Sequence, residues 1–301
     1  MIPSERLAGL SVDIDSIAVH LRGYGIDDAR DDDAHYRVAI PRMLELFAAA
    51  DARATFFLIT AEALRHPQVV RSIVAHGHEV GCHSWTHRLP FALSDPGSVE
   101  REIFEARSRL EELAEAPVVG FRAPSWGVTD ELVSQLRKAG FRYDASSFPS
   151  WVLFALRWSI SRRSASEMGR LRSSVRQGLF EPGVPHLVDH SSGRSMVEIP
   201  LCTTPFARLP YYHTLRFLLP DALFRAIGAA ARWRPTPGYI FHAVDFLALD
   251  ADGLDARIAR HPGMDRPLED KLALVRRSLC ELARGRSVVP LREIADCMIG
   301  F

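Results

Sequence analysis

Residues 54–83 read ATFFLITAEALRHPQVVRSIVAHGHEVGCH and contain the order of elements that decides the fold. The run 54–59 is apolar and β-rich, which predicts a strand, and 78–82 predicts a second one. Between them, residues 61–76 carry apolar side chains at helical spacing, and Gly77 suits the C-cap of that helix. A strand, a helix and a further strand in succession predict that the two strands pair in parallel.

The same alternation extends over most of the chain. Further strands are expected at 10–14, 118–122, 197–201, 238–243 and 287–291, and further helices at 37–50, 96–115, 129–139 and 268–284. This order predicts an α/β fold with a parallel sheet, either doubly wound or closed into a barrel. A length of 301 residues is normal for one α/β barrel, so we expect a single domain over residues 1–301.

One segment, 151–237, interrupts the alternation. Its sequence predicts a hairpin around 191–193, and the amphipathic stretch at 215–234 predicts a helix entered at Pro220. We interpret the segment as an insertion near the barrel mouth that forms a lid or a membrane- or substrate-contact region.

Composition limits the classes of function. Hydrophobic residues make up 47 % and charged residues 25 %, which allows a large core in a soluble protein. The 37 basic and 37 acidic residues cancel, so no basic field indicates nucleic acid as a partner. The N-terminus lacks an apolar signal region, and no apolar run is long enough to span a membrane. Together with 4 cysteines that lack CxxC spacing, this predicts a cytoplasmic protein with free thiols.

Polar residues stand at or just after several of the predicted strands. They are Asp13, Asp15, His83, Arg122 and His242, and Asp144 joins them from a short run before Ser146. In a barrel of parallel strands, the carboxyl ends of all strands face one common mouth. These side chains are therefore expected to converge, although they are far apart in sequence.

Two of the motifs suggest a metal site. His83 and His87 are four residues apart, so a helix or tight helical turn would point both imidazoles the same way. Asp13 and Asp15 are two apart on a strand and share one face, so one carboxylate can bind metal while the other accepts a proton. A catalytic metal typically takes three protein ligands and keeps one position open. The alternative is that the histidines are incidental and the aspartates end a strand in solvent.

Five stretches in order resemble the motifs of the polysaccharide deacetylases, the NodB-homology group or carbohydrate esterase family 4. They are SVDID (11–15), HSWTH (83–87), FRAPSW (121–126), YDASS (143–147) and IFHAVD (240–245). The resemblance covers residues 8–150 and 195–295. It implies a distorted (β/α) barrel, and segment 151–237 is then an insertion between the fourth and fifth motifs.

The resemblance also implies a role for each motif residue. Asp15, His83 and His87 would bind one divalent metal, usually Zn²⁺, with Co²⁺, Ni²⁺ or Mn²⁺ as alternatives; Asp13 would be the general base, Arg122 would orient it, and His242 would be the general acid, paired with Asp144. Such a site would hydrolyse the C–N bond of an N-acylated amino sugar. Arg122 could instead be a plain buried ion-pair residue, and Asp144 could only cap a turn.

Three further residues are candidates for substrate binding. By analogy with the family, a backbone N–H near Ser125 would stabilise the oxyanion. Trp85 and Trp126 flank the proposed site and could stack on a sugar face or belong to the core.

The chain departs from the commonest family pattern at three positions. Ile14 separates the two aspartates, as in a branch that includes some peptidoglycan deacetylases and the deformylase of aminoarabinose lipid. Ser125 replaces an aromatic residue, and Ala243 replaces the proline after the acid histidine. These changes put an open polymer-binding groove in doubt and leave deacetylation and deformylation both open.

The insertion bears on the substrate. Residues 151–163 are apolar and then basic, and 157–176 hold six arginines, a composition typical of segments that lie on anionic membranes. The favoured interpretation is N-deacylation of a lipid-linked amino sugar by a cytoplasmic protein that contacts the inner face of the membrane. Alternatives are a soluble deacetylase of a small amino sugar, sugar nucleotide or oligosaccharide, and a catalytically inactive carbohydrate-binding barrel.

Overall fold

The computed structural model describes residues 6–29, 33–88, 96–152, 181–188 and 195–300. The strands are β1 (Leu7–Ile14), β2 (Thr55–Leu58), β3 (Glu79–Cys82), β4 (Gly120–Phe121), β5 (Tyr143–Asp144), β6 (His186–Val188), β7 (Met196–Glu198), β8 (Gly238–His242) and β9 (Ser287–Val289). The helices are α1 (Ile17–Gly23), η1 (His35–Ala39), α2 (Ile40–Ala49), α3 (Thr60–Ala63), α4 (Pro67–Ala75), α5 (Pro96–Val99), η3 (Glu100–Glu105), α6 (Ala106–Ala114), η4 (Pro124–Trp126), α7 (Asp130–Lys138), α10 (Thr214–Leu218), α11 (Asp221–Ala231), η5 (Ala243–Phe246), η6 (Ala256–Arg260), α12 (Leu268–Ala283) and α13 (Leu291–Ile299).

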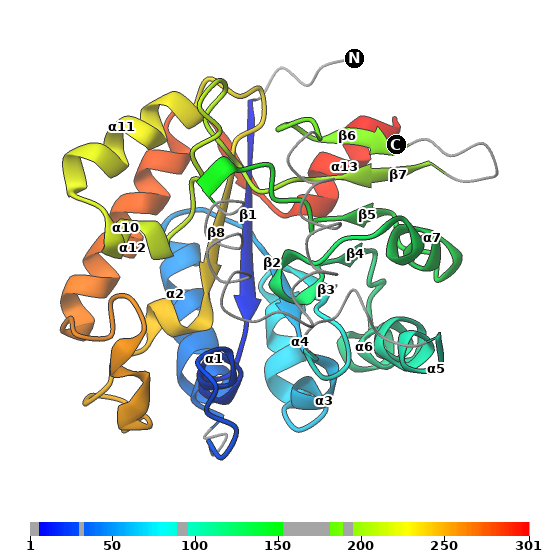
Figure 1. Ribbon diagram of the computed structural model, residues 1–301, viewed down its shortest axis with the longest axis horizontal. Coiled ribbons are helices and arrows are strands. Elements are labelled where there is room, and N and C mark those ends of the chain that lie inside the picture. The colour runs from blue at the N-terminus through cyan, green and yellow to red at the C-terminus, as the bar shows by residue number, and fades with distance from the viewer. Residues whose placement is uncertain (1–5, 30–32, 89–95, 153–180, 189–194, 301) are drawn as a thin grey trace.

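All strands belong to one curled sheet, which the helices surround (Figure 1). The order is β6-β7-β5-β4-β3-β2-β1-β8, and β9 pairs with the start of β1. Every pairing is parallel except that of β6 with β7. The prediction of a distorted (β/α) barrel is thus confirmed.

Strand β1 pairs with β2, β8 and β9, and its successive side chains point alternately into the core and toward the site. Leu10, Val12 and Ile14 are fully buried and belong to the main core cluster. Since successive side chains of a strand point to opposite faces, Asp13 lies on the other face, toward the barrel interior. That interior is partly filled by Phe57, and its ring lies so close to Gly81 that a β-carbon there would approach within 2.6 Å.

The predicted elements agree with the structure in order but differ in detail. The helix predicted at 215–234 is two helices, α10 and α11, because Pro220 ends the first and precedes the second. The strand predicted at 287–291 ends at Val289, and Pro290 is the N-cap of α13, which begins at Leu291. Gly77 follows α4 with φ +78°, the left-handed conformation expected after a helix end.

Segment 151–237 is described only in part. Residues 153–180, which contain all six arginines of 157–176, and the hairpin turn at 191–193 lie outside the described residues. Strands β6 and β7 of this segment pair antiparallel, as the hairpin requires, and β7 joins the main sheet beside β5. The role of the segment as a lid or membrane contact stays a prediction. Among the described residues, no helix combines the length and apolar character needed to cross a bilayer.

Candidate active site

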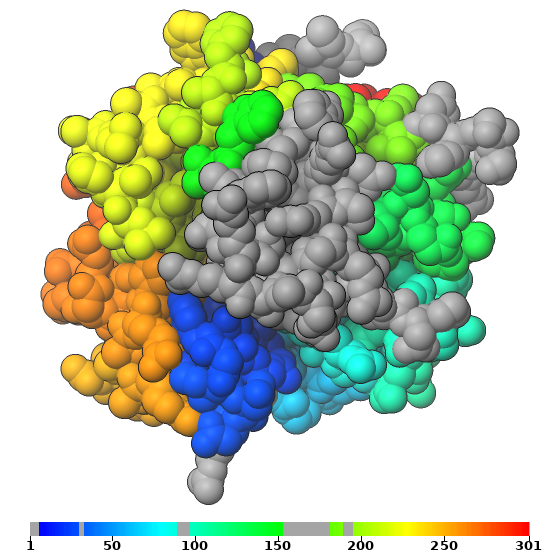
Figure 2. Space-filling model, in the orientation of Figure 1, coloured from blue at the N-terminus to red at the C-terminus, as the bar shows by residue number. Residues whose placement is uncertain are grey.

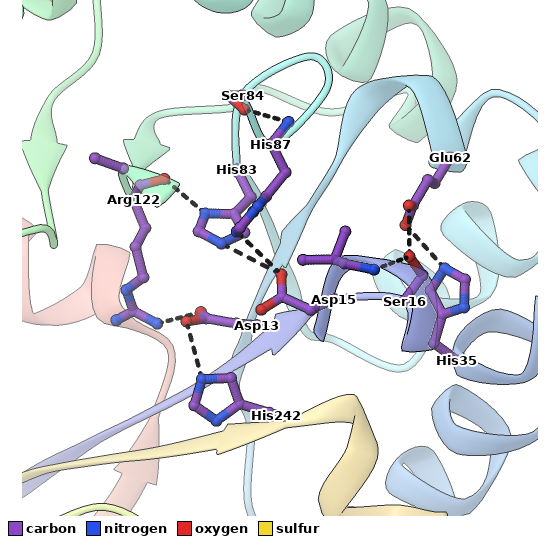
Figure 3. A network of polar contacts seen from close by, with 12 residues as sticks. Asp13, Asp15, Ser16, His35, Glu62, His83, Ser84, His87, Arg122 and His242 are labelled. Carbon is purple, nitrogen blue, oxygen red and sulfur yellow. Dashed lines mark hydrogen bonds and ion pairs between the residues drawn. The ribbon is translucent and has the colours of Figure 1, made fainter. Parts of the chain in front are cut away.

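The two aspartates of the first motif lie at the carboxyl end of β1 and face the same way (Figure 3). Asp13 is in register with His242 of β8 on one side and with Phe57 of β2 on the other. Asp15 follows the strand directly, and the next residue, Ser16, caps α1 by accepting the N–H of Val19. The chain turn after β1 therefore fixes Asp15 at the rim of the barrel.

His83 and His87 follow β3 on a turn that is not helical, contrary to the sequence-based expectation. Ser84 and His87 have φ values of 67° and 54°, so the turn passes through the left-handed region twice. Inside the turn, the Ser84 hydroxyl accepts the N–H of His87 at 3.0 Å. This geometry turns the two imidazole rings toward each other, with centroids 4.9 Å apart.

A buried carboxylate that sequence reasoning missed holds this turn. Glu102 of η3 accepts the backbone N–H groups of Trp85 and Thr86 at 2.9 and 3.0 Å. Its other oxygen accepts the Thr86 hydroxyl at 2.6 Å. Nothing in the local pattern of η3 distinguishes Glu102 from its exposed neighbours, because its partners come from another segment.

Asp15, His83 and His87 meet as a buried group whose ligand atoms all lie within 4.8 Å of one another. Asp15 Oδ1 is 3.5 Å from His83 Nε2 and 3.6 Å from His87 Nε2, too far for good hydrogen bonds. The same oxygen is buried without a hydrogen-bond partner in the described structure. Two nitrogens around an unpartnered oxygen suit a divalent cation with an open fourth position.

The pKa shifts of the three residues bear on metal binding. Burial lowers the pKa of His83, but the polar contact with Asp15 and the charges of Asp13 and Asp15 raise it above its usual value, so a metal would displace a proton there. Burial lowers the pKa of His87 to about 4, so its imidazole is neutral near pH 7. Although burial alone would raise the pKa of Asp15, His87 and His83 hold it well below its usual value. His83 Nδ1 lies 2.7 Å from the carbonyl oxygen of Arg122 and donates to it, which leaves Nε2 as the electron-pair donor. The three residues therefore fit the predicted metal, whose identity the donor set leaves open.

Arg122 binds Asp13 in the barrel interior. Arg122 Nη1 donates to Asp13 Oδ1 at 2.6 Å, and both side chains are almost fully buried. Further donation to the Ser11 hydroxyl and the Ala145 carbonyl fixes the guanidinium. Its plane also lies over Phe57, 4.2 Å from the ring centroid. Arg122 thus holds Oδ1 of Asp13 in place, and Oδ2 remains available on the side of the pocket.

His242 approaches that second oxygen, with Nε2 3.8 Å from Asp13 Oδ2. The predicted pairing of His242 with Asp144 is not found, since the two share no hydrogen bond or ion pair in the described structure. Asp144 accepts the Ser146 hydroxyl and stands in register with buried Glu198, and burial raises the pKa of Asp144 to about 7. The carboxylate beside His242 is Asp245, which accepts the His242 backbone N–H at 2.8 Å.

The two tryptophans have different environments. Trp85 is 8 % exposed and packs in the main core, which favours the core alternative for this residue over a contact with substrate. Trp126 lines the pocket beside Ser125, and both have left-handed backbone conformations. Trp126 also packs edge to face on Phe148, with ring centroids 5.4 Å apart.

A pocket of about 300 Å³ opens at this end of the barrel. Its lining includes the predicted residues Asp13, Asp15, His83, His87, Ser125, Trp126 and His242, together with Val19, His20, Gly23, Tyr24, Ala123, Tyr212, Thr214 and His261. Sequence reasoning missed His20, Tyr24 and His261, because α1 and the turn after η6 carry no motif that marks them.

Comparisons with known proteins place these features in a family. The model of the polysaccharide deacetylase family matches residues 30–143. A peptidoglycan deacetylase of Helicobacter pylori is 34 % identical over 149 residues, which cover 47 % of this chain and 50 % of that protein. A chitooligosaccharide deacetylase of Sinorhizobium fredii is 32 % identical over 164 residues, covering 51 % of this chain and 70 % of the relative. The chain thus spans half the length of the first relative and more of the second.

Solved structures share the fold at lower identity. A Mycobacterium smegmatis protein assigned to the polysaccharide deacetylases aligns with a TM-score of 0.62 and 19 % identity, over 100 % of this chain and 92 % of that one. The allantoinase PuuE aligns with a TM-score of 0.59 and 17 % identity, over 99 % and 91 %. At such identities the likeness concerns the fold alone.

Proposed function

The chain belongs to the polysaccharide deacetylase family, and from this premise we propose that it is a metal-dependent hydrolase that removes the acetyl group from an N-acetylated amino sugar. The observation that carries the proposal is the pairing of two groups at one pocket. The potential metal ligands Asp15, His83 and His87 lie beside the buried Asp13–Arg122 ion pair. The names of the relatives favour acetyl over formyl as the acyl group.

The proposed mechanism assigns one task to each side chain. A bound divalent cation would polarise the amide carbonyl and lower the pKa of water. Asp13 accepts the proton of the attacking water, because its hydrogen bond from Arg122 holds the carboxylate in position. His242, on the neighbouring strand, donates a proton to the nitrogen of the leaving amine. A backbone N–H near Ser125, which lines the pocket, would donate to the amide oxygen.

A finer proposal concerns where the sugar is carried. We propose that it is lipid-linked and presented at the inner face of a membrane. Support comes from the apolar and basic sequence 151–163 and from the described start of that stretch, where Trp151 and Val152 are 52 % and 45 % exposed. The rival substrate is a soluble amino sugar, sugar nucleotide or oligosaccharide. A catalytically inactive carbohydrate-binding barrel would have no need for the buried Asp13–Arg122 pair beside a metal site.

Acetate release tests the proposal directly. Purified protein is stripped of metal with a chelator, reloaded with Zn²⁺, Co²⁺, Ni²⁺ or Mn²⁺, and incubated with chitooligosaccharides, peptidoglycan fragments, a sugar nucleotide or membrane lipid extract. We expect hydrolysis only after reloading, and mass spectrometry identifies the product that has lost 42 Da, the mass of an acetyl group exchanged for hydrogen. Equal activity of stripped and reloaded protein would refute metal dependence. Tight glycan binding without acetate release from any substrate would favour the binding barrel.

A further inference from the structure

One part of the pocket lining contains polar aromatic side chains that the proposed reaction does not use. His20 lies in α1, Tyr24 is the C-cap residue of that helix, and His261 follows η6. The His20 and His261 rings are 4.6 Å apart between centroids, and the Tyr24 hydroxyl lies 3.1 Å from His261 Nδ1. The N-terminal and C-terminal parts of the chain that carry them lie side by side at the surface (Figure 2). We call His20, Tyr24 and His261 the histidine wall.

The histidine wall has unused hydrogen-bonding capacity. His20 Nε2 and His261 Nε2 are buried, and neither has a hydrogen-bond partner within the described structure. Leaving a buried nitrogen without a hydrogen-bond partner costs free energy. Rotating an imidazole ring by about 180° would place a ring carbon where each nitrogen now lies. A ligand in the pocket could therefore supply the missing partners.

The charge of the wall restricts the class of ligand. Burial lowers the pKa of His20 to about 4 and lowers that of His261 further, so both rings are neutral at pH 7. No lysine or arginine is among the described residues that line the pocket. Neutral imidazoles and a phenol form hydrogen bonds with hydroxyl groups, whereas a phosphate or carboxylate binds most strongly to cationic partners.

Another part of the lining is apolar and aromatic. Trp126 packs on Phe148, and Phe148 packs on Tyr212 with ring centroids 6.1 Å apart. Trp126 and Tyr212 both line the pocket. A sugar ring has an apolar face that stacks on such rings and hydroxyl groups around its edge. The combination of aromatic rings with neutral polar groups thus matches an uncharged sugar.

We propose that the histidine wall is the site that binds the hydroxyl groups of the sugar ring next to the reacting acetamido group, and that it selects an uncharged amino sugar there. This inference rests on the proposed function. It implies that any phosphate of a lipid-linked substrate is recognised outside the described pocket lining. It also implies discrimination against sugars with an acidic substituent on the ring that enters the pocket.

The test combines protein variants with modified ligands. His20→Phe and His261→Phe keep a ring of similar shape but remove the nitrogens, and His76→Phe, at an exposed position after α4, is the matched control. Wild type and variants are assayed for acetate release from chitooligosaccharides and from O-methylated chitooligosaccharides, which cannot donate hydrogen bonds from those positions. A small acetyl ester without hydroxyl groups serves as a reference substrate.

We expect each wall variant to raise KM for the chitooligosaccharide about 3- to 10-fold, the effect of one hydrogen bond between neutral groups, with kcat little changed. The wild-type preference for free hydroxyls over O-methyl groups should shrink in the variants, while ester hydrolysis and metal content stay at wild-type levels. Unchanged KM and preference, or an equal fall on sugar and ester, would overturn the inference.

Two additions keep the inference testable. If the phenylalanine variants do not fold, His20→Gln and Tyr24→Phe address the same contacts with smaller changes. Equal or tighter binding of acidic sugars than of neutral ones would overturn the proposed selectivity. A wild type that hydrolyses neither amide nor ester would overturn the proposed function itself, whereas an active wild type with indifferent wall variants overturns only this inference.

Discussion

Replacing Asp13 by Asn tests the role of the proposed base separately from that of the proposed metal ligands. The side chain of Asn keeps an oxygen that can accept from Arg122 Nη1, now 2.6 Å from Asp13 Oδ1, and it leaves Asp15 untouched. We therefore expect normal metal content but a loss of turnover of about 10²- to 10⁴-fold, the usual contribution of a general base.

The same structure predicts a modest change in stability. A hydrogen bond to a charged acceptor contributes about 1.5–3 kcal/mol and a neutral one about 0.5–1.5 kcal/mol, so Asp13→Asn should cost about 1–2 kcal/mol. Asp13→Ala leaves one guanidinium nitrogen of buried Arg122 without that acceptor and should cost more, about 3–5 kcal/mol. The remaining bonds of Arg122 to Ser11 and Ala145 keep this cost toward the lower end.

Three measurements check these values on each variant and on Asp250→Asn, a control at an exposed position. They are acetate release, bound metal by mass spectrometry and urea unfolding. Near-wild-type turnover of Asp13→Asn would show that Asp13 is not the base, and loss of metal would show that it is a ligand. Equal destabilisation by Asn and Ala would refute the argument from the buried ion pair.

Three other predictions concern the turn, the interior and the membrane. Glu102→Gln should weaken metal affinity about 10- to 100-fold in a chelator competition, because Glu102 holds the His83–His87 turn, whereas exposed Glu105→Gln should not. Burial raises the pKa of Glu79 from 4.5 to about 7, so the folded state binds the extra proton and stability falls as pH rises from about 4.5 to 7. Glu79→Gln lacks this titration, so its free energy of unfolding in urea should rise relative to that of the wild type by on the order of 2 kcal/mol between pH 5 and pH 8. A difference that stays constant with pH would contradict the assignment. Purified protein should co-sediment with anionic but not neutral vesicles, and changing Arg157, Arg162 and Arg163 to Glu should release it while metal content stays intact; a wild type that stays in the supernatant at low salt would refute the membrane proposal.

Much of the fold and of the proposed reacting set could be predicted from local pattern. Apolar runs such as 54–59 alternate with segments whose apolar residues have helical spacing. This order requires parallel pairing of the strands, with all their carboxyl ends at one rim. Asp13, His83 and His242 stand at such ends, so the barrel brings them together whatever the details of packing.

Contacts between segments that are distant in sequence could be identified only in the folded chain. Trp85 lies between the proposed ligands His83 and His87 in sequence yet packs in the core, because the turn that carries it passes twice through left-handed backbone. Asp144 pairs with the neighbouring strand through Glu198, and the carboxylate at His242 comes from the next turn as Asp245. Which side chains meet depends on strand register and turn conformation, and neither can be read from the spacing of residues in the sequence.

The residues that complete the pocket illustrate the same limit. Glu102 reaches the ligand turn from η3, and His20 meets His261 only because α1 packs beside η6. A periodic pattern reports which face of a helix is apolar, but the partner of that face is set by the packing of the whole barrel. Strand order thus predicts where the site lies, while tertiary packing determines which side chains surround the substrate.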